Sequence, residues 1–278
     1  MNKADKTPAV LTIAGSDSGG GAGIQTDLRT FNAFRVYGCS AITAVTAQNP
    51  DEVRRVDVLE AAAVRAQIET VLDSIPVRFA KTGMLANREI IECVVNTARE
   101  RKLELVVDPV MVSTSGSRLL QESAISAIKE QLLPLAQWLT PNIPEAEIIC
   151  GRKITSSDDL ASAALEIYEQ YGCSVILKSG RLTNEDNAAD MICRNGELFI
   201  LSSPWLSVAG NTVQGAGCTL SAALTSNLAL GFSWDRAVMN AKAFVYGALA
   251  DKVFLSDTLS QMYPPEKSYF DQVVLTKC

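Results

Sequence analysis

The sequence predicts an α/β fold in which a central, mainly parallel β-sheet is covered by helices on both faces. Short apolar runs typical of buried strands alternate with helical stretches at intervals of about 30 residues. Such alternation indicates βαβ units, whose crossover helices cover a parallel sheet. No internal repeat, low-complexity segment or linker divides the 278 residues. We therefore expect one domain, an α/β/α sandwich, over residues 1–278.

The elements of the first half follow from apolar runs and their end signals. The clearest strand, residues 103–111, contains an apolar run that ends in Asp108, and Pro109 disfavours helix at that carboxylate. Asn87 suits a helix N-cap, and Pro76 closes the helix before it. Strands are expected at residues 9–14, 39–47, 77–85 and 103–111, and helices at residues 24–34, 61–74 and 88–101.

The second half repeats the pattern and adds a hairpin. Pro144 suits the first turn of a helix. Arg194-Asn195-Gly196 separates two short strands and predicts a hairpin turn. Strands are expected at residues 138–140, 173–180, 188–193 and 197–202, and helices from Pro144, at residues 156–171, 218–230 and 234–253.

Composition excludes several classes of function. The chain has no histidine, which removes Ser-His-Asp and Cys-His catalysis and His-ligated zinc, so any metal should be oxygen-ligated, as Mg²⁺ is. A net charge of −6 without basic clusters argues against nucleic acid. Seven scattered cysteines, no signal peptide and no long apolar run predict a soluble, cytoplasmic protein with reduced thiols and no membrane partner.

The most informative stretch is Gly215-Ala216-Gly217-Cys218, directly before an alanine-rich helix. Glycines allow close approach of a ligand, and the first amides of a helix lack intrahelical acceptors. Together they predict an anion site that suits phosphate. Cys218 would lie in this field, so we expect a lowered thiol pKa. The alternative is a glycine-containing loop before a core helix, with Cys218 as a small apolar residue.

Polar residues follow several of the predicted strands, where α/β proteins bind ligands. Asp108 and Glu145 are carboxylates in such places, although they also suit helix capping or the helix dipole. Lys178, before Ser179-Gly180, is a plausible charge beside a phosphate. Gln48 suits hydrogen bonding to a polar ring, or simply a turn before Pro50. These four residues are therefore candidates for one site.

Taken together, the motifs resemble those of hydroxymethylpyrimidine/phosphomethylpyrimidine kinases, from Val10 to about Ala250. The matching segments are Ala14-Gly15-Ser16-Asp17, Gly20-Gly21-Ala22-Gly23-Ile24-Gln25 with Asp27, Ala47-Gln48-Asn49, Lys81-Thr82-Gly83-Met84-Leu85, Asp108-Pro109-Val110-Met111, Thr140-Pro141-Asn142 with Pro144-Glu145, and Gly215-Ala216-Gly217-Cys218-Thr219-Leu220.

The resemblance implies a ribokinase-like fold and an enzyme of thiamin biosynthesis. Such an enzyme uses ATP and Mg²⁺ to phosphorylate 4-amino-5-hydroxymethyl-2-methylpyrimidine and then its monophosphate. A homodimer is also implied. By the same resemblance, the substrate would contact Gly15, Asp17, Gln48 and Met84; ATP would contact Lys178, Gly180, Thr212 and Gln214; Mg²⁺ would be held by Asp108 and Glu145; and Gly215, Ala216 and Gly217 would form an anion hole beside Cys218, the base.

The chain departs from the family pattern near the expected phosphates. Val213 and Gln214 stand where relatives carry Thr and His, Thr114 stands where they carry Lys, and Ser179 replaces a glycine. These changes remove a cation and a hydroxyl. They keep two alternatives open: a pyridoxine/pyridoxal kinase, and a non-catalytic binding protein of the same fold. A redox role for Cys218 is weaker, because no resolving cysteine is near in sequence.

Overall fold

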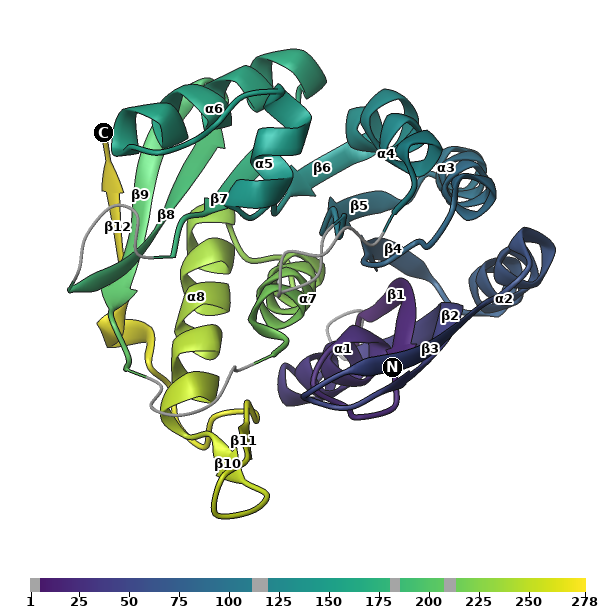
Figure 1. The fold of residues 1–278 in the computed structure, drawn as a ribbon, viewed down its shortest axis with the longest axis horizontal. Coiled ribbons are helices and arrows are strands. Elements are labelled where there is room, and N and C mark those ends of the chain that lie inside the picture. The colour runs from purple at the N-terminus through teal and green to yellow at the C-terminus, as the bar shows by residue number, and fades with distance from the viewer. Residues whose placement is uncertain (1–5, 112–119, 181–185, 208–213) are drawn as a thin grey trace.

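A ten-stranded sheet forms the centre of the computed structural model, which describes residues 6–111, 120–180, 186–207 and 214–278 (Figure 1). Neighbouring strands run parallel from β2 to β7, and antiparallel strands extend both edges. The order across the sheet is β12 (Val274–Lys277), β9 (Glu197–Pro204), β8 (Asn187–Arg194), β7 (Ser174–Lys178), β6 (Ala136–Leu139), β5 (Glu104–Val107), β4 (Val77–Thr82), β1 (Ala9–Asp17), β2 (Tyr37–Gln48) and β3 (Val53–Val58).

Helices cover both faces of this sheet (Figure 1). One face carries α2 (Ala61–Ser74), α3 (Arg88–Arg101), α4 (Glu122–Ala127), α5 (Ile143–Cys150) and α6 (Ser157–Tyr171). The other carries α1 (Gly23–Ala33), α7 (Ala216–Ala229) and α8 (Trp234–Ala250). The predicted mainly parallel α/β/α sandwich is confirmed, whereas the single-domain organisation stays a prediction.

Side chains of the central strands alternate between two apolar layers. In β5, Leu105 and Val107 pack under α2–α6, whereas Val106 faces α7 and α8. In β7, Val175 and Ile176 divide in the same way. Strands buried on both faces must be apolar throughout, which explains why these runs were recognisable in the sequence. Among the described residues, no helix is long and apolar enough to cross a membrane.

Three regions were not predicted. Every residue of β3 is exposed, and its sequence, Val-Arg-Arg-Val-Asp-Val, contains no apolar run that would predict a strand. The strand forms by pairing with β2. After α4 the chain continues through a π-helical turn, residues 128–132, and a 3₁₀ turn, residues 133–135. The C-terminal tail forms the small hairpin of β10 (Val253–Phe254) and β11 (Ser260–Gln261) before β12 joins the edge of the sheet.

Helix caps agree with the sequence. The Asn87 side chain accepts the Ile90 N–H at the start of α3. Asn142 and Glu145 form a reciprocal capping box at α5, with both hydrogen bonds 2.9 Å long. Such boxes satisfy amides that the helix itself leaves unpaired. The start of α7 differs from the prediction by two residues, because the helix begins at Ala216 rather than Cys218.

Strand order changes direction at β1. The chain passes from β1 to β2 on one side, and β4 then pairs with the other side of β1. Ligands of open α/β sheets bind beyond the carboxyl ends of the strands at such a point. We therefore expect a ligand site among the residues that follow β1, β4, β5 and β7.

Candidate functional site

The start of α7 forms the floor of the candidate site. Gly215 takes a left-handed conformation, φ 86°, and any Cβ there would lie 2.0 Å from the Gly21 carbonyl oxygen, so only glycine fits. Thr219 is the first residue whose N–H bonds back into the turn, to the Gly215 carbonyl at 2.8 Å. The amides of residues 216–218 thus lack intrahelical acceptors, and they can bind an anion.

The side chains of Lys178 and Asp108 lie next to the first turn of α7. A Cβ at Gly217 would lie 3.0 Å from the Lys178 Nζ and 3.7 Å from the Asp108 Oδ2. The Lys178 Nζ donates to the Asp108 Oδ1 at 3.1 Å. The strand ends of β5 and β7 and the glycines before α7, all predicted as site residues, therefore come together at one point.

Asp108 is the most highly connected carboxylate of this site. Besides Lys178, the Thr140 hydroxyl donates to its Oδ1 and the Ser221 hydroxyl to its Oδ2, both at 3.3 Å. Burial alone would raise the pKa of Asp108, but the ammonium groups of Lys178 and Lys81 hold that pKa below its ordinary value. Asp108 therefore stays ionised among cations.

Glu145 is a second buried carboxylate in the same field. Burial raises the pKa of Glu145 to about 7; the Lys178 ammonium opposes this shift and the Asp108 carboxylate adds to it. Glu145 also caps α5, so the predicted helix-terminal role is correct. A divalent cation bound near the two carboxylates would offset the repulsion that Asp108 exerts on ionised Glu145.

These residues fit Mg²⁺. Carboxylate oxygens are the hard ligands that Mg²⁺ prefers, and it commonly takes only one or two from protein, with water and phosphate oxygens completing its octahedron. Consistent with that pattern, no group of three or more Asp, Glu or Cys side chains able to hold a metal occurs in the described parts of the chain.

The residues predicted to contact the substrate lie around the ends of β1, β2 and β4. A Cβ at Gly15 would lie 2.6 Å from the Met84 Cε, so these two residues are in contact. The Thr43 hydroxyl fixes the Met84 carbonyl at 2.6 Å. Gln48 is half-buried, and its Oε1 accepts the Thr46 hydroxyl at 3.3 Å. Gly15, Met84 and Gln48 therefore belong to the same end of the sheet as Asp108.

Asp17 is held within the glycine-rich turn between β1 and α1. Its buried carboxylate accepts the N–H groups of Gly19 and Ala22, each at 2.8 Å. These bonds satisfy backbone donors that the turn exposes. The side chain thus shapes the turn, and its predicted contact with substrate stays a prediction.

The expectation of a lowered pKa for Cys218 is wrong. Burial raises the pKa of the thiol to about 11, while Lys81 and a Gly23 N–H act in the opposite direction. The start of a helix favours a thiolate, but here the loss of water around the sulfur and the nearby carboxylates of Asp27 and Asp108 outweigh that effect. Cys218 is a protonated thiol at neutral pH.

A fully buried ion pair lies close to Cys218 and was not predicted as a pair. The Lys81 Nζ contacts both oxygens of Asp27, at 2.7 and 2.8 Å, and the Thr12 hydroxyl donates to the same carboxylate at 2.6 Å. Burial lowers the pKa of Lys81, but Asp27, together with Cys218 and Asp108, raises it by more, so the pKa lies above its ordinary value. A charged residue in an apolar strand and another on the inner face of α1 were the available signal.

The turn after β7 is anchored from α8. Lys242 donates to the Asp190 Oδ2 at 2.7 Å, and the Asp190 Oδ1 accepts the Ser179 N–H at 3.3 Å. Gly180 then takes a left-handed conformation, φ 61°. This arrangement fixes the backbone next to Lys178. Thr212, Val213 and Thr114 lie outside the described residues.

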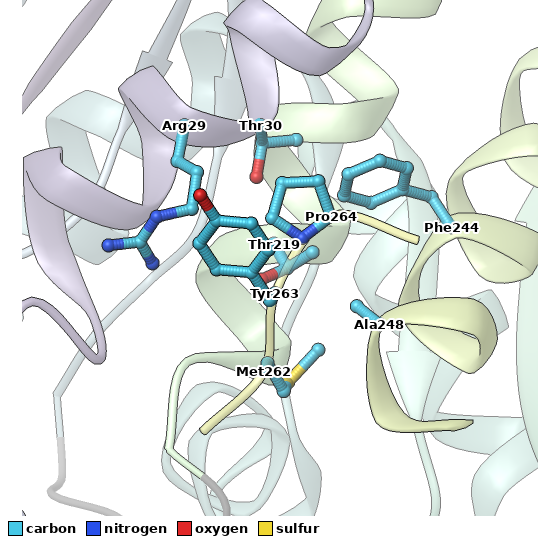
Figure 2. Close-up of a pocket in the computed structure, with 8 residues that line it drawn as sticks. All are labelled: Arg29, Thr30, Thr219, Phe244, Ala248, Met262, Tyr263 and Pro264. Carbon is cyan, nitrogen blue, oxygen red and sulfur yellow. The ribbon is translucent and has the colours of Figure 1, made fainter. Parts of the chain in front are cut away.

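A small cavity shown in Figure 2 lies apart from these residues. Its volume of about 10 Å³ suits one water molecule at most. It lies between the C-terminal tail and helices α1, α7 and α8. Beside it, the Arg29 guanidinium lies over the Tyr263 ring, 5.5 Å from the ring centroid. The lining residues are Arg29, Thr30, Thr219, Phe244, Ala248, Met262, Tyr263 and Pro264. A cavity of this volume is too small for an organic ligand.

Residues 17–262 match the protein family described as phosphomethylpyrimidine kinase. The chain belongs to that family. The hydroxymethylpyrimidine/phosphomethylpyrimidine kinase of Synechococcus elongatus is 42% identical over 260 residues, which cover 92% of this chain and 98% of that protein. The resemblance predicted from the motifs is therefore confirmed.

Solved structures agree with this family assignment. The Staphylococcus aureus pyridoxal kinase in complex with ADP is 33% identical, with a TM-score of 0.88, over 98% of this chain and all of that one. The Clostridium difficile phosphomethylpyrimidine kinase is 41% identical, with a TM-score of 0.77, over 88% of this chain and all of that one. The ribokinase-like fold predicted for the family is confirmed.

Replacing Glu145 with Gln should change how stability depends on pH. The folded-state pKa of about 7 exceeds the unfolded value of about 4.3, so the stabilisation is complete below the unfolded pKa and is lost as pH rises through the folded one. We expect wild type to lose on the order of 2 kcal/mol relative to E145Q between pH 5 and pH 7. Urea unfolding in metal-free buffer measures this difference. Gln can still accept the Asn142 N–H, and parallel pH curves would contradict the shift.

Proposed function

We propose that this chain transfers the γ-phosphoryl group of ATP to the hydroxymethyl group of 4-amino-5-hydroxymethyl-2-methylpyrimidine, and then phosphorylates the monophosphate to the diphosphate. The observation that carries the proposal is the convergence of Lys178, Asp108 and the amides at the start of α7. We propose this point as the phosphate site; it lies beyond the same ends of the strands as Gly15, Met84 and Gln48. Membership of the kinase family supports the reaction class.

The proposed mechanism relies on position and charge. Phosphoryl transfer needs little covalent assistance from protein, and preorganised donors stabilise the charge on the transferred group. We assign the stabilisation of that charge to the amides of residues 216–218 and to the Lys178 ammonium. Mg²⁺, held by Asp108 and by Glu145 through water, would neutralise phosphate oxygens when bound. The Gln48 amide and Met84 would orient the pyrimidine.

ATP is proposed as the phosphoryl donor, bound beside the turn after β7. Lys178 and Gly180 belong to that turn, and the pair of Lys242 and Asp190 anchors it. A nucleotide-bound relative of the same fold supports this assignment. Contacts of Thr212 with ATP remain part of the proposal from sequence, as does localisation in the cytoplasm.

A homodimer is part of the proposal. At one edge of the sheet, β3 has no strand paired with its outer side within the described part of the chain, and it exposes Val53, Val56 and Val58. Long exposed edge strands that carry apolar residues are normally covered. A second copy of the chain would cover this edge. Sedimentation equilibrium should give about twice the chain mass of 29.8 kDa, and substitution of Val56 by Asp should lower it; a wild-type monomer would contradict the dimer.

An ADP-release assay with a panel of acceptors tests the proposed function. The purified protein is incubated with MgATP and, separately, with hydroxymethylpyrimidine, its monophosphate, pyridoxine and pyridoxal. We expect kcat/KM to be highest for the two pyrimidines. Preference for a pyridoxine or pyridoxal would identify the vitamin B6 alternative, and absence of ADP with every acceptor would favour a binding protein.

Substitution of Cys218 by Ala should affect the two phosphorylations differently. The first acceptor is an alcohol that must lose a proton, and we propose that the Cys218 thiolate accepts that proton. The second acceptor is a phosphate that is already ionised near neutral pH. We expect kcat for the alcohol to fall about 10²- to 10⁴-fold and kcat for the monophosphate to fall far less. With the thiol pKa at about 11, wild-type turnover of the alcohol should also rise with pH from 7 to 9.

Steady-state rates with each acceptor measure this split in both proteins. The monophosphate reaction serves as the control for folding and ATP binding. Equal losses for both acceptors, or an alcohol reaction in C218A that keeps the wild-type rate, would exclude Cys218 as the base.

A further inference from the structure

Three loops from distant parts of the chain meet at Gly21. Gly21 lies in the turn between β1 and α1, Gln214 directly precedes the glycines of α7, and Pro50 follows β2. A Cβ at Gly21 would lie 3.2 Å from the Gln214 Oε1 and 3.5 Å from the Gln214 Cβ. The side chain of Gln214 therefore lies flat against the backbone of the glycine-rich turn.

The amide nitrogen of Gln214 forms a long-range hydrogen bond. Its Nε2 donates to the Pro50 carbonyl at 3.1 Å, across 164 residues of sequence. A proline carbonyl in a turn has no ladder partner, so a side-chain donor satisfies it. This bond joins Gln214, the residue before Gly215, to the turn that follows Gln48 at the end of β2.

Separate hydrogen bonds join the glycine-rich turn between β1 and α1 to the end of β2. The Ser18 hydroxyl donates to the Gln48 carbonyl at 2.8 Å, and the Gln48 N–H donates to the Ser18 hydroxyl oxygen at the same distance. Gly19 packs against this backbone, because a Cβ there would lie 3.0 Å from the Gln48 carbonyl oxygen. The glycine-rich turn is thus held between Gln48 on one side and Gln214 on the other.

A second amide reaches Gly21 from the C-terminal tail. Gln261 is 8% exposed, its Oε1 lies 3.2 Å from the same Cβ position, and neither amide atom has a hydrogen-bond partner among the described residues. Gly21 is therefore crowded from two sides. A side chain at this position would therefore shift the amide groups of Gln214 and Gln261 by a few tenths of an ångström.

We propose that Gln214 is a positioning residue that fixes the distance between the phosphate-binding amides at the start of α7 and the turn that follows Gln48. This inference rests on the proposed function, because it assigns Gln214 to aligning the pyrimidine alcohol with the phosphoryl group. Alignment of two bound reactants is where small displacements cost most in rate. The departure from the family residue at this position thus has a structural role.

Substitution of Gln214 by Met tests the proposal, because Met keeps the length and neutrality of Gln but cannot donate a hydrogen bond. We expect kcat for hydroxymethylpyrimidine to fall about 10- to 100-fold. Affinity for a non-hydrolysable ATP analogue with Mg²⁺, titrated by calorimetry, should change less than about twofold, since the phosphate-binding amides remain. A larger loss of affinity would instead identify Gln214 as the ATP contact that the sequence predicts, and would overturn the positioning role. Gly21→Ala places a methyl group against the Gln214 amide and should also lower kcat for hydroxymethylpyrimidine.

Gln137→Met is the matched control. Gln137 lies in β6, is exposed, and also donates one side-chain hydrogen bond, to Glu104 at 2.6 Å. Its loss should leave kcat unchanged. Wild-type kcat in Q214M would overturn the proposal, as would an equal loss in Q137M.

Hydrogen exchange separates this inference from the proposed function, because it needs no turnover. The turn after β2 is closed by Asn49, whose N–H donates to the Glu52 carbonyl and whose Oδ1 accepts the N–H groups of Asp51 and Glu52. These amides should exchange several-fold faster in Q214M than in wild type, while α3 stays unchanged. Unchanged exchange in this turn overturns the positioning role even if no acceptor is phosphorylated.

Discussion

The bond between Lys178 and Asp108 is the interaction around which the site is arranged. It joins the ends of β5 and β7, and Thr140 and Ser221 add the end of β6 and the second turn of α7 to the same carboxylate. A buried carboxylate without such partners would become neutral. Four elements must therefore be in register for Asp108 to remain charged, and that register also places the amides of α7 beside Lys178.

Two further buried ion pairs hold the elements around this point. Lys81 and Asp27 connect β4 to α1, and Lys242 and Asp190 connect α8 to β8. Burying charges is costly, and removing one partner leaves the other uncompensated. These pairs therefore constrain the relative positions of the elements more than they stabilise the fold. The first pair also places the Lys81 ammonium near Cys218 and Asp108, in a protein whose net charge is −6.

Much of the fold could be predicted because its strands are buried on both faces. Apolar runs such as Leu105-Val106-Val107 have no alternative but the centre of a sheet. Exposed β3 and the π-helical turn after α4 carry no such pattern, since their form depends on neighbours rather than on local sequence.

The site was predictable to the extent that strand ends carry it. Asp108, Lys178 and the glycines before α7 were recognised from position, and the structure brings them together. Two properties were not accessible. The thiol pKa of Cys218 depends on desolvation by segments far away in sequence, and the partner of Gln214 is a backbone carbonyl, which no side-chain pattern reveals.

The identity of the product in wild type and in Asp108→Asn tests the central claim most directly. Each protein is incubated with MgATP and hydroxymethylpyrimidine, and products are followed by phosphorus NMR. We predict that wild type forms the pyrimidine monophosphate and then the diphosphate. The isosteric amide, which lacks the charge that Lys178 and Mg²⁺ require, should slow both steps at least about 100-fold. Wild-type rates in the Asn variant, or phosphate released to water instead of pyrimidine phosphates, would contradict the account.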